Sequence, residues 1–290
     1  MEKYVDLHCH SKYSDGKYSV EKLIELAKLN DVDFLSIMDH DNIDSAKDII
    51  KYRNDGQIQL INGIELSTVF VMEGEEIYMH LLGYDYNPTD TQLLSEMERY
   101  RCILFENNTI FLRRLRKNIS LIPSCIFEEF DLYSYKLGDT QIREILVKNK
   151  FDKNFIDSFV NKAKKFMPEY QGYELDAKVA IEILRKSGGI SVLAHPNKIK
   201  ISNTAKEDLI NILAKTGLTG IETYHSSFSS ADFGYFKYLA AKNQLLESVG
   251  SDYHFDTIND KIILGKGINN NLCQSDCSIK KLLLQRRRQW

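Results

Sequence analysis

The sequence predicts an α/β fold with a largely parallel sheet, and two observations lead to this prediction. Segments with strand character and segments with helical periodicity alternate over residues 4–87 and again over residues 172–254. Such alternation is typical of parallel sheets whose strands are joined by helices. The chain has 290 residues, which suits one barrel of about 250 residues with an insertion. A hydrophobic content of 43% allows a substantial core.

The composition excludes several classes of protein. A net charge of −3 and a pI of about 6.2 argue against a protein that coats nucleic acid. Five cysteines without a Cys-x-x-Cys pair predict neither a disulfide framework nor a zinc finger. We expect no signal peptide, because the first residues read directly as a strand, and no apolar run approaches the roughly 18 residues of a membrane span. We therefore expect a cytoplasmic, reduced protein without membrane attachment and without an obligate protein partner.

Strands and helices follow one another through the first 87 residues. The opening strand, residues 4–11, ends in the pair His8-x-His10, whose side chains project on one face because strand side chains alternate. Ser19 is expected to cap a helix whose apolar residues recur at helical spacing. The other elements predicted here are a helix at residues 45–54 and strands at residues 33–38, 59–64 and 76–84.

From about residue 88 to residue 171 the alternation stops. A long amphipathic helix is predicted at residues 92–117, and shorter helices at residues 128–135, 140–149 and 153–166. We interpret residues 88–171 as a helical insertion over a barrel formed by residues 1–87 and 172–290. Residues 99–165 hold 14 Lys and Arg against 8 Asp and Glu. A basic cover of this kind favours an anionic substrate, but an ordinary solvated helical surface explains the charge equally well.

The alternation resumes after residue 171. Asp176 is expected to cap a helix that stops at Gly188, and a helix at residues 206–216 is expected to stop at Gly217. A helix beginning near Ser230 and a last, solvated helix with Lys280 and Lys281 follow. Strands are predicted at residues 190–194, 220–224 and 245–250.

All seven histidines lie at or beside the carboxyl end of a predicted strand, or inside the strand at residues 76–84. They are His8, His10, His40, His80, His195, His225 and His254. Carboxylates occupy the same places, namely Asp15, Asp39, Asp41, Glu65 and Asp252. In (β/α) barrels the carboxyl ends of the strands meet at one mouth, where active sites are built. An isolated His-x-His pair is often only a pair of surface histidines, but the confinement of all seven predicts a metal site.

Five motifs carry a resemblance to a known family. His8-x-His10, Asp39-His40-Asp41, Glu65, His195-Pro196 and Asp252-x-His254, in this order, resemble the polymerase-and-histidinol-phosphatase (PHP) superfamily. The resemblance implies a distorted seven-stranded (β/α) barrel that holds two or three divalent metal ions. Asp15-Gly16 and the helical insertion resemble the small phosphatase branch, whose members act on nucleoside 3′,5′-bisphosphates and on short RNA from its 5′ end.

The resemblance also implies a role for each ligand. The first metal would be held by His8, His10, Glu65 and Asp252, the second by Glu65, His80 and His195, and the third by Asp15, His40 and His254. Catalytic roles fall on Glu65, Asp252 and His254. Imidazoles mixed with carboxylates, without thiolates, suit Mn²⁺, Fe²⁺ or Zn²⁺.

Four residues near these ligands are given other roles. We expect Cys9 to pack into the sheet as a small hydrophobe. Asp6, Asp39 and Asp41 are not needed as ligands. For these three carboxylates, orienting a ligating imidazole and accepting turn or cap hydrogen bonds are equally compatible with the sequence.

The residues that contact the substrate are less clearly indicated. His225 precedes a hydroxyl-rich run that opens a helix, so His225 and Ser226 are expected to contact a phosphate, together with Arg143 and Lys198. Nucleotide-directed members of the branch usually carry Gly-Arg-Pro-His in the insertion. Here the corresponding stretch reads Gly138-Asp139-Thr140-Gln141, and an Asp repels phosphate. Either another basic residue replaces the arginine (Arg143, Arg99, Arg101 or Lys198), or the substrate differs.

Together these observations predict a metal-dependent phosphoesterase that hydrolyses a phosphomonoester of a small molecule or nucleotide with a metal-activated hydroxide. One alternative is a 5′-3′ exonuclease on short single-stranded RNA or DNA, with Tyr133, Tyr135, Phe151 and Phe155 available for stacking, although aromatics at this spacing more often form core. A phosphatase of the histidinol-phosphate type is another. An amidohydrolase-type barrel fits Asp39-His40-Asp41 and Asp252-x-His254 less well. A non-catalytic metal-binding module would lack ligands, and none is missing.

Overall fold

The computed structural model describes residues 3–52, 56–119, 122–135, 137–168, 172–255 and 261–286. The chain divides into two compact units. The barrel unit consists of Met1–Ser95 and Glu174–Trp290, and the helical unit consists of Glu96–Tyr173. Among the described residues, no helix is both long enough and apolar enough to cross a membrane.

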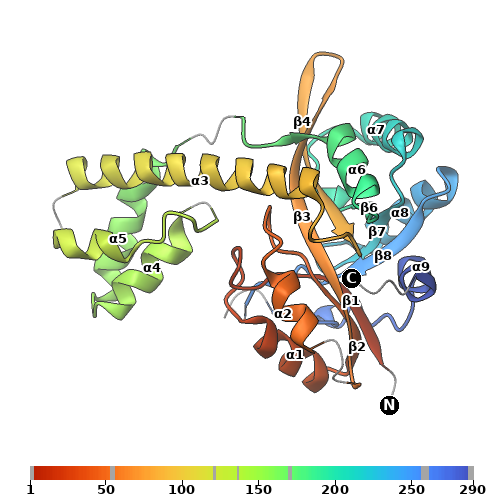
Figure 1. Ribbon diagram of the computed structural model, residues 1–290, viewed down its shortest axis with the longest axis horizontal. Coiled ribbons are helices and arrows are strands. Elements are labelled where there is room, and N and C mark those ends of the chain that lie inside the picture. The colour runs from red at the N-terminus through yellow and green to blue at the C-terminus, as the bar shows by residue number, and fades with distance from the viewer. Residues whose placement is uncertain are drawn as a thin grey trace. The chain divides into compact units, whose positions relative to one another are not determined.

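The barrel unit is built on one sheet in the strand order β1-β2-β3-β4-β6-β7-β8, with β5 paired to β3 (Figure 1). The strands are β1 Tyr4–Cys9, β2 Val32–Ile37, β3 Gln59–Met72, β4 Glu75–Tyr84, β5 Leu175–Asp176, β6 Ile190–Leu193, β7 Gly220–His225 and β8 Leu246–Gly250, while β9 Ile262–Ile263 and β10 Gly267–Ile268 pair separately. The helices of this unit are α1 Val20–Leu29, α2 Ser45–Tyr52, α6 Ala177–Lys186, η3 Pro196–Lys198, α7 Asn203–Thr216, α8 Ser230–Lys242 and α9 Ser278–Arg286. The predicted caps Ser19 and Asp176 are confirmed, and α7 ends at Gly217 with φ 111°.

The first and last strands of the sheet approach each other at their carboxyl ends. The amide of Asp252, just beyond β8, donates to the carbonyl of His8 in β1 at 2.7 Å, and the amide of His10 donates to the carbonyl of Tyr253 at 2.8 Å. These bonds nearly close the sheet into a barrel. The predicted barrel-like α/β fold is confirmed, and residues from opposite ends of the sequence meet at this edge.

The pairing of β4 differs from a purely parallel sheet. β4 runs antiparallel to both β3 and β6, whereas the other neighbours along the main sheet are parallel. The prediction that the third strand ends before Glu65 is wrong, because β3 continues to Met72. Glu73 and Gly74 both have positive φ, 54° and 87°, and form a tight turn that returns the chain into β4.

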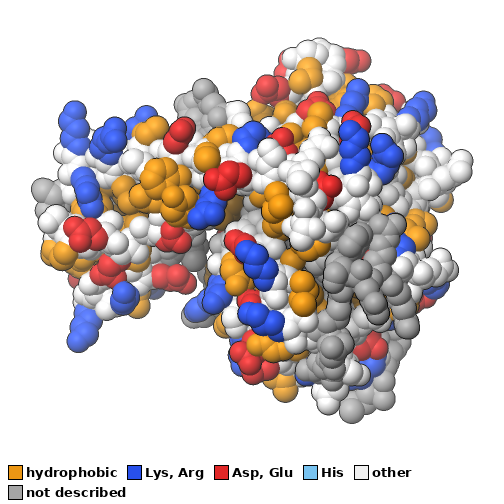
Figure 2. All heavy atoms as spheres, viewed as in Figure 1, with side chains coloured by type: hydrophobic (Ala, Val, Ile, Leu, Met, Phe, Trp, Pro, Cys, Tyr) orange, Lys and Arg blue, Asp and Glu red, His pale blue; other side chains and the backbone are white. Residues whose placement is uncertain are grey.

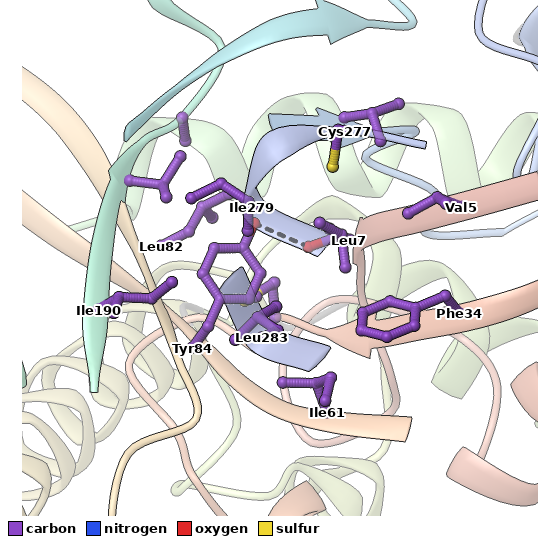
Figure 3. Close-up of a cluster of buried hydrophobic side chains, with 14 of the residues drawn as sticks. Val5, Leu7, Phe34, Ile61, Leu82, Tyr84, Ile190, Cys277, Ile279 and Leu283 are labelled. Carbon is purple, nitrogen blue, oxygen red and sulfur yellow. Dashed lines mark hydrogen bonds between the residues drawn. The ribbon is translucent and has the colours of Figure 1, made fainter. Parts of the chain in front are cut away.

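A buried hydrophobic cluster packs among the strands of the main sheet (Figure 3). It combines side chains from β1, β2, β3, β4, β6 and β8 with Ile279 and Leu283 of α9. Inside it, the hydroxyl of Tyr84 donates to the carbonyl of Leu7 at 3.1 Å, which satisfies the phenol in an apolar setting. Cys9 is buried in a neighbouring cluster, as predicted, and its thiol donates to the carbonyl of Ser36. This packing fixes the strands whose ends carry the polar residues.

The helical unit has its own hydrophobic core. Its elements are α3 Thr91–Asn118, of which residues 91–95 belong to the barrel unit, η1 Ser124–Glu129, α4 Asp139–Lys148, α5 Lys153–Ala163 and η2 Lys164–Phe166. The predicted helix at residues 128–135 is wrong, since only the short η1 forms before a turn. The reason is the buried Asn108, whose amide donates to the carbonyls of Leu132 and Ser134, both at 2.9 Å, and accepts from the amide of Leu137. The covering role predicted for this unit stays a prediction.

Lys and Arg side chains lie on the surface of the helical unit (Figure 2), and three of them are paired with carboxylates of the same unit. Arg143 contacts the carboxylates of Asp139 and Asp157, and Lys164 lies 3.2 Å from Asp139. Lys148 pairs with Glu129 at 2.7 Å. Exposed pairs of this kind contribute little to stability, but they reduce the positive charge offered to a ligand. The excess of basic residues in the sequence therefore does not translate into free cations at these positions.

Candidate metal centre

The centre of the predicted site is the fully buried carboxylate of Glu65, in the middle of β3. Its two oxygens face imidazole nitrogens contributed by β1, β4 and the segments that follow β2 and β6. Oε2 lies 3.1 Å from Nε2 of His8, 3.2 Å from Nε2 of His10 and 3.5 Å from Nε2 of His40, and Oε1 lies 2.8 Å from Nδ1 of His80 and 2.9 Å from Nε2 of His195. One carboxylate thus joins five of the seven histidines.

His8 and His10 form the first group together with Glu65 and Asp252. Their Nε2 atoms lie only 3.2 Å apart, because alternate residues of β1 share a face. Oδ1 of Asp252 lies 3.1 Å from His10 Nε2 and 3.5 Å from His8 Nε2. The ligand atoms of all four residues lie within 4.8 Å of one another. These are the four residues that the sequence analysis assigned to a first metal.

A second group surrounds Asp15, in the loop after β1. Its Oδ2 lies 3.3 Å from Nε2 of His254 and 3.8 Å from Nε2 of His40, and its Oδ1 lies 3.5 Å from Nδ1 of His10. The loop passes so close to β1 that a Cβ at Gly16 would lie 2.2 Å from the carbonyl oxygen of His10. All nine residues predicted as ligands are therefore brought into one connected cluster.

His80 and His195 reach Glu65 by different routes. His80 lies inside the antiparallel strand β4, opposite Ser67, so it meets Glu65 only because β3 extends past that residue. His195 follows β6 with a φ of 24°, and Asp252 follows β8 with a φ of 57°. Non-glycine residues in this region cost about 1–3 kcal/mol each and are concentrated at functional sites. The backbone strain at these two strand ends is consistent with a site built for binding.

The proximity of acids and imidazoles shifts their pKa values. Burial alone would raise the pKa of Glu65, but His40 and His8 hold it well below its usual range. Burial would lower the pKa of His10, yet its hydrogen bonds with Asp252 and Glu65 raise it to about 10. His195 is different, since burial prevails and lowers its pKa to about 4. Without a cation, His10 therefore carries a proton at neutral pH that a metal ion must displace.

The donor set fits divalent metal ions. It consists of imidazole nitrogens and carboxylate oxygens without a thiolate, which suits borderline cations of the first transition row. Two imidazole nitrogens 3.2 Å apart beside one carboxylate oxygen are placed to share a cation. Nδ1 of His10 is buried and has no hydrogen-bond partner among the described residues, with the Asp15 carboxylate 3.5 Å away. A proton on Nδ1, facing Asp15, leaves the lone pair of Nε2 for the cation shared with His8.

Glu222, in β7, belongs to the site but was not singled out from the sequence. It is fully buried, its Oε1 lies 3.0 Å from Nδ1 of His8, and its Oε2 accepts from the amide of His195 at 2.5 Å. A carboxylate that accepts the Nδ1 proton of His8 orients the ring so that the lone pair of Nε2 points toward the cluster. The sequence did contain one indication of this role, because Glu222 is a charged residue within a predicted strand and lies three residues before His225.

The three remaining carboxylates accept hydrogen bonds from backbone and hydroxyl groups. Asp6 accepts from the amides of Ser251 at 2.9 Å and Gly265 at 2.7 Å. Asp39 accepts from the amide of Ser11 at 2.8 Å and from two serine hydroxyls. Asp41 accepts from the amide of Ser67 at 2.8 Å and from its hydroxyl at 2.7 Å. These bonds agree with the turn-and-cap alternative, and they hold the ends of the strands that carry the ligands.

The predicted substrate contacts are found in different places. Lys198, in η3, places Nζ 2.6 Å from Oδ2 of Asp252, with its side chain about half exposed. His225 is 1% exposed, and the hydroxyl of Ser226 donates to the carbonyl of Ser251. Arg143 belongs to the helical unit, where it is paired with two aspartates. Of these four, Lys198 and His225 lie against the cluster around Glu65.

Comparison with known proteins gives consistent results. The family described as PHP domain matches residues 6–207. The chain is 26% identical over 258 residues to a 5′-3′ exoribonuclease of Haemophilus influenzae, covering 88% of this chain and 91% of that protein. It is 26% identical over 260 residues to a 3′,5′-nucleoside bisphosphate phosphatase of Chromobacterium violaceum, covering 86% and 87%. A predicted metal-dependent phosphoesterase from Bifidobacterium adolescentis has the same fold, with a TM-score of 0.71 at 20% identity over 98% and 96% of the two chains.

Proposed function

The chain belongs to the PHP domain family and is a metal-dependent phosphoesterase, and from this premise we propose that it hydrolyses a phosphomonoester of a small molecule or nucleotide. The observation that carries the proposal is the Glu65 carboxylate, buried and faced by five imidazoles at one end of the barrel. Such a cluster holds several cations close together, which is the requirement for binding a phosphoryl group.

We assign the ligands in three sets, the first two of which share Glu65. Glu65 joins His8, His10 and Asp252 in the first set and His80 and His195 in the second, while Asp15, His40 and His254 form the third. Mn²⁺, Fe²⁺ and Zn²⁺ are the ions that suit this donor set. When bound, such ions neutralise phosphoryl oxygens and make a water molecule nucleophilic near neutral pH.

The protein's own side chains contribute binding and charge at the edge of the cluster. Lys198 has a half-exposed ammonium group beside Asp252, and it is the predicted basic residue best placed to donate to a phosphoryl oxygen. His254 is about one quarter exposed, its Nδ1 lies 2.8 Å from the carbonyl of Asp252, and its Nε2 faces Asp15, so Nε2 is the atom that would bind a cation of the third set. Lys198 thereby supplies the cation that the branch usually takes from the arginine replaced here by Asp139.

A panel of substrates tests the proposal. The protein reconstituted with Mn²⁺ is assayed for phosphate release from a nucleoside 3′,5′-bisphosphate, a nucleoside 5′-monophosphate, a 5′-phosphorylated oligoribonucleotide, histidinol phosphate and a sugar phosphate. We expect turnover of at least one monoester that is lost on chelation and restored by Mn²⁺. Absence of release from every member, with the metal bound, would contradict the proposal.

A 5′-3′ exonuclease is the second candidate, because a relative with 26% identity over most of the chain is named a 5′-3′ exoribonuclease. The aromatic residues of the helical unit give it little support. Tyr133 packs against Phe105 and Arg101, and Phe151 stacks on Phe155 beside the core of that unit. Mononucleotide release from the oligoribonucleotide, with a steep dependence on salt, would favour this candidate over a small-molecule phosphatase.

A further inference from the structure

We propose that His225 is a positioning residue rather than a metal ligand: with Lys198 it holds Oδ2 of Asp252, so that only Oδ1 faces the metal centre. The inference rests on the proposed metal-dependent function and specifies how one of its ligands is oriented. Three features support it, namely the hydrogen bonds of the His225 ring, the contrast with His8, and the surroundings of the two Asp252 oxygens.

The hydrogen bonds at Nδ1 fix the tautomer of His225. The backbone amide of Ser227 donates to Nδ1 at 3.1 Å, and the hydroxyl of Ser227 lies 2.8 Å from the same atom. A backbone N–H can only donate, so Nδ1 is the acceptor and the ring proton of neutral His225 is on Nε2. The side-chain amide of Asn197 donates to the Ser227 hydroxyl at 3.0 Å and holds this arrangement.

His8, in β1, shows the opposite arrangement. Its Nδ1 faces the carboxylate of Glu222 at 3.0 Å, so Nδ1 carries the proton and Nε2 has the free lone pair. His8, Glu222 and His225 also lie close enough together to suggest a further cation site. The tautomers exclude this cation site, because Nε2 of His225 carries a proton and Nδ1 of His8 is hydrogen-bonded to Glu222. The group that is hydrogen-bonded to Nδ1 therefore determines whether Nε2 of each histidine can bind a metal ion.

The two oxygens of Asp252 have different surroundings. Oδ1 faces the imidazoles of His10 at 3.1 Å and His8 at 3.5 Å. Oδ2 lies 2.6 Å from Nζ of Lys198 and 3.4 Å from Nε2 of His225. One oxygen thus faces predicted ligands, and the other faces two donors.

The His225 ring has Asp252 as its natural acceptor. Its Nε2 is buried and makes no hydrogen bond of good geometry within the described residues, and the whole residue is 1% exposed. A substrate oxygen has no access to an atom buried in this way. A buried N–H without a partner is destabilising, so a small closure onto Oδ2 is favourable. The closure would also hold Asp252, whose backbone is at a φ of 57°.

Nuclear magnetic resonance of the zinc-loaded protein tests the tautomers directly. Protein labelled with ¹⁵N in its histidines is examined for the protonation of each ring nitrogen, and His225 is assigned by comparison with the His225→Gln variant. We expect His225 with an unprotonated Nδ1 and a proton on Nε2, and His8 with a proton on Nδ1. A proton on Nδ1 of His225, or zinc on its Nε2, would overturn the inference.

Zinc affinity, measured by competition with a chelator, tests the effect on Asp252. His225→Leu removes the donor and should weaken the tightest site about 10- to 100-fold, the range expected when a group that orients a ligand is lost. His225→Gln keeps an N–H near the same place and should retain most of the affinity. Ser227→Ala is the matched control, because the backbone amide still fixes the tautomer. Unchanged affinity in a folded His225→Leu protein would refute the role, and if that variant does not fold, the wild-type tautomer decides.

These readouts are independent of turnover. A protein that binds zinc as described but hydrolyses no phosphoester would refute the proposed function and leave the role of His225 standing. A protein that hydrolyses phosphoesters but has the opposite tautomer at His225 would refute this inference alone.

Discussion

Replacement of Glu222 by Gln removes one negative charge from the centre while keeping the size of the side chain. The carboxylate serves two donors at once, Nδ1–H of His8 and the backbone amide of His195. An amide has a single acceptor oxygen, so Glu222→Gln satisfies only one of them. If its NH₂ group faces His8, the imidazole must move its proton to Nε2, the nitrogen that faces Glu65.

The magnitude follows from these two contacts. A hydrogen bond to a charged group contributes about 1.5–3 kcal/mol, and a buried donor left without an acceptor costs about 1–3 kcal/mol. Glu222 is fully buried, so water cannot replace the lost partner. A loss near 1.4–2.8 kcal/mol corresponds to about 10- to 100-fold in the dissociation constant of the metal. This agrees with the effect expected of a residue that orients a ligating histidine.

The assay is a zinc titration of the purified protein against a competing chelator, followed by thermal unfolding with and without zinc. Glu247→Gln is the matched control, because Glu247 lies on the neighbouring strand β8 and pairs with Thr223 at 3.0 Å instead of with a predicted ligand. We expect Glu222→Gln to lose affinity and Glu247→Gln to keep it. Equal zinc affinity in wild type and Glu222→Gln would refute the role of the carboxylate.

Three further predictions concern the same centre. Glu65→Ala should lower turnover by several orders of magnitude and reduce bound metal, because two ligand sets share this carboxylate; full turnover with full metal content would contradict the bridging assignment. The pKa of His10 is raised from 6.5 to about 10, so its protonated form stabilises the metal-free protein below pH 6.5, and this stabilisation is lost as the pH rises through about 10. Apparent metal affinity should therefore rise over that window, with proton release measurable by calorimetry in buffers of different ionisation enthalpy; a flat profile with no release would contradict the shift. Gly250→Ala places a Cβ 2.2 Å from that of His8 and should cost about 1–3 kcal/mol of unfolding free energy, measured in urea; wild-type stability would show that the close approach is not required.

The cluster of ligands could be predicted because its causes are local in the sequence. His8 and His10 share a face since strand side chains alternate, and the carboxyl ends of parallel strands meet at one edge. Both rules act on short stretches that a sequence displays. The order of the motifs, which resembles that of the PHP superfamily, also led to the assignment of Glu65 as a carboxylate shared by two metal ions.

What the sequence did not display depends on contacts between distant residues. Glu222 reads as an ordinary charged residue of a strand, and only the pairing of β7 with β8 and the closure onto β1 place it against His8. The extension of β3 past Glu65 requires its hairpin partner β4. Likewise, the segment after η1 is held out of a helix by Asn108, more than twenty residues earlier in the chain. Tertiary contacts override local propensity in each case.

The position of the cations is the most direct test of the account. Crystals of the protein grown with Mn²⁺ can be measured at the manganese absorption edge, where anomalous scattering locates each ion. We expect at least two peaks with the Glu65 carboxylate between them, one beside His8 and His10 and one beside His80 and His195. A single peak away from Glu65, or none in the cluster, would contradict the proposed centre.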